Sequence, residues 1–221
     1  RPSFTEVAHL PLKERTAALG DPARKARILA EPTGHGFARL FRLMDEGRKI
    51  WLMTDPPNYE PDPKDSLHAK AMARGLDPWS YVYDALLQNQ GKALLYTPFA
   101  NYADNNLDCC RDMILHKDTV MGLGDGGAHV GTICDASFIT SLLTHWGRDR
   151  SRGAGIDLPT LIKCQARDTA RAVDLTDRGT LEPGMRADVN IIDFDNLNVR
   201  LPEIVNDLPA GGARLQQRAD G

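Results

Sequence analysis

Asp125 has the setting of a catalytic carboxylate. It lies in the run Gly124-Asp125-Gly126-Gly127-Ala128-His129, which directly follows the apolar stretch 119–123. Glycines on both sides let the backbone approach a ligand closely, because no bulky neighbour blocks it. Barrel enzymes keep their catalytic groups on loops just past buried strands. Asp125 is therefore a candidate catalytic residue, although from these residues alone a turn former is the stronger alternative, since Asp and Gly both suit tight turns.

Three further residues are candidates for substrate binding. His129 lies four positions after Asp125, where its ring can bind substrate or make a structural hydrogen bond. Asn101 and Tyr102 belong to the loop that follows the apolar run 93–96, and this loop is expected beside the loop of Asp125. For Asn101 a role in turn formation is the stronger alternative, because Asn tolerates turn geometry.

Histidine and cysteine spacing gives no familiar metal-binding motif. The sequence contains no His-x-His pair, no His-Glu-x-x-His helix and no Cys-x-x-Cys pair. Cys109 and Cys110 are adjacent, so they project in different directions from one helix and are expected to pack in the core. We also expect His145 to be a hydrogen-bonded core residue and His116 to lie at a helix C-terminus, where a cation is favoured.

Alternating strands and helices are predicted around these candidates. Helices are expected over 66–74, 79–89, 106–116, 136–146 and 158–173, and short buried strands over 93–96 and 119–123. Such alternation is typical of parallel strands joined by helical crossovers, which brings the loops at the carboxyl ends of the strands to one face. The predicted fold class is therefore α/β.

The first part of the chain has a different pattern. Helices are predicted over 12–19 and 23–29, the second with an Asp21-Pro22 start, and a strand over 49–53. Residues 55–63 contain four prolines, which preclude regular backbone hydrogen bonding. We interpret this segment as a stiff surface loop, either a lid or a connector.

Composition excludes several classes of protein. The 221 residues are 42% hydrophobic and 26% charged with a formal net charge of -3, which is ordinary for a soluble globular protein. The sequence lacks the basic footprint of a nucleic-acid-binding protein, an apolar stretch that could span a membrane and a signal peptide. We expect a cytoplasmic protein with reduced cysteines. Because the chain begins at Arg1 without a methionine, we expect it to be a fragment.

Residues 178–193 resemble a segment of a known protein family. Gly179 and Gly184 precede Ala187-Asp188 and a β-rich apolar run. This pattern resembles the junction that follows the catalytic barrel in the amidohydrolase superfamily. Together with the run 124–129 and Leu143-Thr144-His145-Trp146, the chain resembles the C-terminal part of the N-acyl-D-amino-acid deacylase (D-aminoacylase) family over nearly its whole length.

The resemblance implies an architecture. It implies the C-terminal part of a (β/α)8, TIM-type, metal-dependent hydrolase barrel together with part of a small β domain. We accordingly expect a lid-like helical and loop region at 1–64, the last barrel strands and helices at 65–177, and the start of the β domain at 178–221.

The resemblance also implies a chemistry. Asp125 matches the family's catalytic acid and base at the end of the last barrel strand, and its side chain is also a candidate metal contact. The implied cofactor is zinc, whose other ligands come from earlier barrel strands that do not occur in this chain. We therefore expect the chain alone to be inactive, and either a homo-oligomer or an N-terminal segment to complete it. No nucleic-acid or membrane partner is expected.

The sequence is compatible with more than one class of substrate. An N-acyl-D-amino acid carries a carboxylate that a guanidinium would bind well, and Arg148, Arg150 and Arg152 are candidates, although solvated surface charge is the expected state of at least two. Some family members carry an arginine in the loop after the catalytic aspartate, and residues 130–136 contain none. A hydantoinase-like cyclic amidase and a catalytically silent fragment or scaffold are the alternatives.

Overall fold

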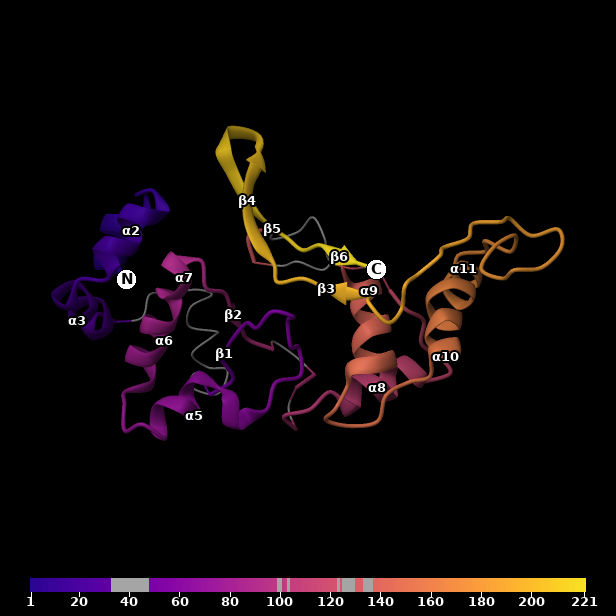
Figure 1. Cartoon of the computed structure of the whole chain (residues 1–221), viewed down its shortest axis with the longest axis horizontal. Coiled ribbons are helices and arrows are strands. Elements are labelled where there is room, and N and C mark those ends of the chain that lie inside the picture. Colours follow the sequence, from indigo (N-terminus) through magenta and orange to yellow (C-terminus); the bar gives the residue numbers. More distant parts are fainter. Residues whose placement is uncertain (33–47, 99–100, 103, 123, 125–129, 133–136) are drawn as a thin grey trace. The chain divides into compact units, whose positions relative to one another are not determined.

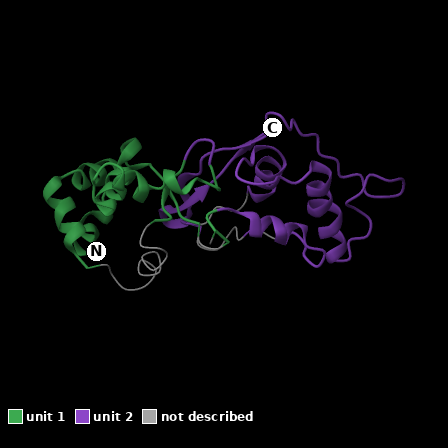
Figure 2. Ribbon diagram, turned by 90° about the horizontal axis from the view of Figure 1, so that it is seen from below, with its two compact units in different colours: residues 1–53, 58–105 green, residues 54–57, 106–221 purple. Residues whose placement is uncertain are grey.

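The computed structural model describes residues 1–32, 48–98, 101–102, 104–122, 124, 130–132 and 137–221. The chain forms two compact units: residues 1–53 with 58–105, and residues 54–57 with 106–221 (Figure 2). The domains predicted at 1–64, 65–177 and 178–221 are drawn from the architecture of the family, whereas the two units are defined by compactness. The predicted domain boundaries therefore stay a prediction. Within the described part of the chain, no helix is both long and apolar enough to cross a membrane.

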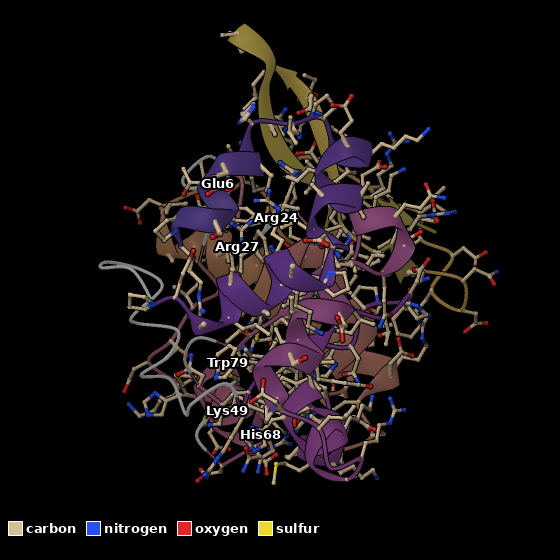
Figure 3. The ribbon with its side chains drawn as sticks, turned by 90° about the vertical axis from the view of Figure 1, so that its left-hand side faces the viewer. Glu6, Arg24, Arg27, Lys49, His68 and Trp79 are labelled. Carbon is tan, nitrogen blue, oxygen red and sulfur yellow. The ribbon has the colours of Figure 1, made fainter. Side chains whose placement is uncertain are left out.

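Unit 1 opens with three short helices, shown in indigo in Figure 1: α1 (Pro2–Ala8), α2 (Leu12–Leu19) and α3 (Pro22–Ala30). The predicted start of α3 is confirmed, because the Asp21 carboxylate accepts a hydrogen bond from the Arg24 N–H at 2.8 Å. Arg24 in turn donates to the Glu6 carboxylate at 2.8 Å, which ties α3 to α1 (Figure 3).

The second part of unit 1 contains the 3-10 turn η2 (Pro63–Asp65) and helices α5 (Leu67–Met72), α6 (Pro78–Leu86) and α7 (Gln88–Gly91). Ser66 and Asp77 cap α5 and α6 through their side chains, as expected of Ser and Asp at these positions. Strand β1 (Trp51–Leu52) pairs with β2 (Leu95–Tyr96), and the Ile50 carbonyl accepts the Leu67 N–H at 2.8 Å. A small core of Ile50, Leu67, Val82 and Ala85 joins these elements.

Unit 2 is mainly helical. It contains α8 (Asp108–Leu115), α9 (Phe138–Ser141), α10 (Leu158–Lys163) and α11 (Thr169–Ala172), with the π-helical segments η3 (Leu142–Asp149) and η4 (Cys164–Asp168) continuing α9 and α10. Its core consists of Leu142, Leu143, Trp146, Ile156, Leu161 and Leu197. The predicted helices 106–116, 136–146 and 158–173 are thus confirmed in place, although the last two contain wide π-type turns.

The C-terminal part of unit 2 forms short antiparallel pairs. Strand β3 (Asn198–Val199) pairs with β6 (Ala219–Asp220), and β4 (Glu203–Leu208) pairs with β5 (Gly212–Gln216) across the 3-10 turn η5 (Pro209–Gly211) (Figure 1). Val205 pairs with Arg214 before the register shifts toward Leu208.

Three expectations about strands are wrong for the described residues. The three strand pairs there are antiparallel two-stranded pairs and form no barrel, so the parallel arrangement is not observed. Residues 119–122 are not a strand, because the Thr119 hydroxyl bonds the Met113 and His116 carbonyls and so belongs to the end of α8. The β-rich run 189–192 is not a strand either, since the strand pairs involve other segments, and Ile191 is 97% exposed. Mixed helix and strand content still fits the α/β class.

Candidate functional site

The loop after β2 carries two of the predicted substrate contacts. Asn101 is exposed and has a left-handed backbone with φ of 61°, whereas its neighbour Tyr102 is buried with 2% of its surface exposed. The left-handed backbone agrees with the turn-forming alternative for Asn101, because Asn is one of the few residues that tolerate it. Substrate binding by Asn101 stays a prediction.

Tyr102 is held at both ends. Its hydroxyl donates to the Pro61 carbonyl, and its own carbonyl accepts from Lys49 Nζ at 2.9 Å. Lys49 Nζ also lies 6.0 Å from the centre of the Tyr102 ring, and the Trp51 ring meets that ring edge-on at 5.9 Å. The structure therefore fixes Tyr102 at its hydroxyl, its carbonyl and its ring, and a direct contact with substrate stays a prediction.

The proline-rich loop is fixed by aromatic side chains. The Tyr96 hydroxyl donates to the Tyr59 carbonyl at 3.0 Å, and Trp51 Nε1 donates to the Asp62 carbonyl at 2.9 Å. With the bond from Tyr102 to Pro61, these contacts supply donors to a segment whose prolines cannot form a regular ladder. Residues 59, 61 and 62 are thereby fixed to other residues of their own unit 1, and the interpretations of this segment as a lid or a connector both stay predictions.

Glu60 lies in the middle of this braced segment and was missed by the sequence interpretation. It is 3% exposed, and its N–H donates to the Asn58 side chain at 2.9 Å. Carboxylates are rarely buried to this extent without a partner. The sequence signal was weak: the polar turn former Asn58 two positions before and Pro61 directly after indicate a turn, but not its burial.

Asp125 and His129 lie outside the described residues, so their predicted roles stay predictions. The chain on the far side of this run is anchored, because the Val130 carbonyl accepts the N–H of Leu215 from β5 at 2.7 Å. Gly124, directly before Asp125, is half-buried.

The sequence of this chain is similar to that of a known protein family. The model of the amidohydrolase family matches residues 74–214. The chain belongs to the amidohydrolase family. The matched range includes all four candidate residues, Asn101, Tyr102, Asp125 and His129. Searches of curated proteins and of solved structures gave no match.

Amidohydrolases are generally metal-dependent, so we tested whether the described side chains fit a metal ion. Among the residues that the structure describes, no three His, Cys, Asp or Glu side chains lie close enough together to hold one. Those residues therefore do not fit a metal site by themselves. Asp125, the predicted metal contact, falls outside the described residues.

In this amidohydrolase, at least two of three arginines were expected to be solvated charges; Arg148 is exposed, whereas the side chain of Arg150 is buried. Arg148 on η3 donates to the carbonyls of Phe194, Asp195 and Leu197, and its paired contact with Asp149 raises the pKa of the guanidinium. This fork joins η3 to the chain before β3.

Arg150 is more deeply embedded. Its side chain is 1% exposed, pairs with Asp108 at 2.6 Å and lies 4.7 Å from the centre of the Trp146 ring. The guanidinium also donates to the Ala154 carbonyl at 2.6 Å. The sequence did not single out Arg150 among the three arginines, because its ion pair with Asp108 joins positions 42 apart.

His116 forms the C-cap of α8, as predicted. His145 is half-buried and meets the ring of buried Trp146 edge-on at 5.0 Å, and its role as a hydrogen-bonded core residue stays a prediction. Cys110 packs against the core of unit 2, whereas the prediction of core packing is wrong for Cys109, which is exposed. Successive helical residues point about 100° apart, so only one of the pair faces the core.

Proposed function

We propose that this protein hydrolyses a carbon–nitrogen bond other than a peptide bond, with N-acyl-D-amino acids as the leading substrate class. The observation that carries the proposal is the amidohydrolase family match over residues 74–214, which includes Asp125 in its glycine-flanked run. Membership of the family supports a hydrolase. The acyl-amino-acid substrate and its D configuration rest on the sequence resemblance alone.

Asp125 is the proposed general base and acid. Hydrolysis of an amide needs a water that has lost a proton and a leaving nitrogen that has gained one. One carboxylate can carry the same proton from the water to the nitrogen, and such positioned groups contribute about 100- to 10,000-fold to the rate. The glycines around Asp125 suit this role because they leave room for a substrate beside the carboxylate.

Zinc is the proposed cofactor. When bound, such an ion lowers the pKa of a water toward about 7 and polarises a carbonyl oxygen. Asp125 is the residue of this chain that we propose to contact it, and His129 is proposed to bind substrate.

The proposed setting is the C-terminal part of a (β/α)8 barrel followed by part of a small β domain, in a cytoplasmic protein. We propose that a second copy or an upstream segment supplies the remaining ligands. The proposed binding partner is the substrate itself, a small-molecule amide.

A metal analysis and a substrate screen of the full-length protein test the proposal. We expect about one or two zinc ions per chain and turnover of N-acetyl-D-methionine above that of N-acetyl-L-methionine. Turnover of hydantoin in place of both would instead favour a cyclic amidase. Absence of hydrolysis in the zinc-loaded protein with every amide tested would contradict the proposal and favour a silent scaffold.

A further inference from the structure

The chain that follows the Asp125 run is bound to the end of strand β5. Val130, the first described residue after that run, accepts the Leu215 N–H at 2.7 Å through its carbonyl. Seven positions later, the Ser137 hydroxyl donates to the side-chain oxygen of Gln217, which directly follows β5. Both bonds thus join this part of the chain to one short stretch that lies 80 positions or more further along the sequence.

Ser137 uses its hydroxyl for this contact and not for its own helix. It occupies the N-cap position of α9, where a serine side chain ordinarily accepts a hydrogen bond from the first helical turn. Here the side chain makes no cap bond, and the residue is only 8% exposed. A buried hydroxyl that loses its partner is costly, so the bond to Gln217 holds the start of α9 against the end of β5.

Gln217 is also held through its nitrogen. Its side-chain amide donates to the Arg200 carbonyl at 2.8 Å, and the Arg200 N–H donates to the Arg218 carbonyl at 2.8 Å. The carboxamide therefore has one partner for its oxygen, before α9, and one for its nitrogen, after β3. Because Gln217 lies only two positions after Leu215, fixing its side chain also limits the movement of the N–H that binds Val130.

We propose that Ser137 and Gln217 are positioning residues for the proposed reaction. They support the backbone bond between Leu215 and Val130, and that bond fixes the chain directly after the Asp125 run. All of these residues belong to unit 2. The inference rests on the proposed function, in which Asp125 moves the proton. Proton transfer needs the two atoms within hydrogen-bond reach, so a small displacement of the carboxylate slows the chemical step more than it weakens substrate binding.

Ser137→Ala and Gln217→Met test this role, because each removes the bond between the two side chains while keeping a similar shape. With the full-length, zinc-loaded protein and N-acetyl-D-methionine, we expect both variants to lower kcat about tenfold or more and to leave KM within about twofold of wild type. Gln217→Glu should keep most of kcat, since its carboxylate still accepts the Ser137 hydroxyl. Thr169→Val is the matched control in the same unit, because it removes a half-buried hydroxyl that bonds the nearby Gln165 and Ala166 carbonyls.

Hydrogen exchange of the Leu215 amide gives a readout that does not depend on activity. Exchange should be faster in Ser137→Ala than in wild type, because the bond from Leu215 to Val130 loses its support. The amides of α10 should stay protected, which shows that unit 2 remains folded. Unchanged exchange at Leu215 would overturn the inference, because the Ser137 hydroxyl would then not support that bond.

The kinetic outcomes separate this inference from the proposed function. If wild type turns over the substrate and kcat is the same in Ser137→Ala, Gln217→Met and Thr169→Val, the positioning role is overturned and the proposed function stands. A Gln217→Glu variant as slow as Gln217→Met would also overturn the positioning role, because keeping the acceptor for the Ser137 hydroxyl would then make no difference. Wild-type protein that hydrolyses none of the amides tested would overturn the proposed function, and this inference with it.

Discussion

At the scale of single residues, the contacts that the sequence did not reveal are those between distant side chains and backbone carbonyls. The glycine run around Asp125 identified a candidate from local chemistry alone. Glu60 was missed because nothing local indicates its burial, and the segment around it is bound by Trp51, Tyr96 and Tyr102, which lie up to 41 positions from their partners in the sequence. The burial of Arg150 was not predicted for a similar reason, since its ion pair with Asp108 joins positions 42 apart in the sequence.

Gly153 is predicted to be intolerant of a side chain. A Cβ there would lie 2.6 Å from Arg150 Nη2 and 2.7 Å from Asp108 Oδ1, and both groups are committed to their ion pair. Gly153→Ala should therefore lower the free energy of unfolding by about 1–3 kcal/mol, measured by urea denaturation. Gly131→Ala is the control, because no atom of the described residues lies within 4 Å of its added Cβ. Equal free energies of unfolding for the two variants would contradict this prediction, because they would show that the ion pair of Arg150 and Asp108 shifts at no cost in stability.

At the scale of secondary-structure elements, local signals predicted helices well and strand pairing poorly. Asp21, Asp77 and Asp157 precede Pro22, Pro78 and Leu158-Pro159, and each caps the helix that was expected there. Strands β1 and β2 were located from their apolar runs, but their antiparallel partnership joins residues more than 40 positions apart. Composition does not specify that choice of partner, and the same limitation explains the missing strand at 189–192.

The contact between α1 and α3 is predicted to depend on pH through Glu31. The Ser3 hydroxyl and N–H both donate to its carboxylate, and the hydroxyl bond is the main cause that lowers the pKa of Glu31 below its usual 4.5. A lowered folded-state pKa means that this contact stabilises the protein above the unfolded pKa and is lost as the pH falls through the folded value. The contact should thus be complete at neutral pH and disappear at acidic pH.

Ser3→Ala tests this contact. A carboxyl NMR titration should show the Glu31 midpoint rising toward 4.5 in the variant, because the hydroxyl donor is gone. Thr5→Ala serves as the control, since the Thr5 hydroxyl bonds the Arg1 carbonyl instead. An identical Glu31 midpoint in wild type and Ser3→Ala would remove the assigned cause.

At the scale of the whole molecule, each compact unit has its own hydrophobic core. The core around Val82 and Leu67 lies wholly in unit 1, and the core around Leu161 and Trp146 lies wholly in unit 2. Contacts within a core couple its residues strongly, whereas distant sites behave almost independently. A destabilising substitution in one core should therefore lower the stability of its own unit first.

Leu161→Ala is expected to destabilise unit 2 by about 2–5 kcal/mol, because Leu161 is 0% exposed and truncation leaves a cavity. Hydrogen exchange should show loss of protection in η3 and α10 while the amides of α5 and α6 stay protected. Ile162→Ala, at the next position and 42% exposed, should change protection little. Equal loss of protection in both units would contradict separate cores.

We propose that Asp125 carries the proton in amide hydrolysis. Its most direct test is the turnover of N-acetyl-D-methionine by the full-length, zinc-loaded protein, compared between wild type and Asp125→Asn. We predict that the variant keeps its fold by circular dichroism and loses at least about 99% of kcat. Near-normal turnover by Asp125→Asn would contradict the assignment.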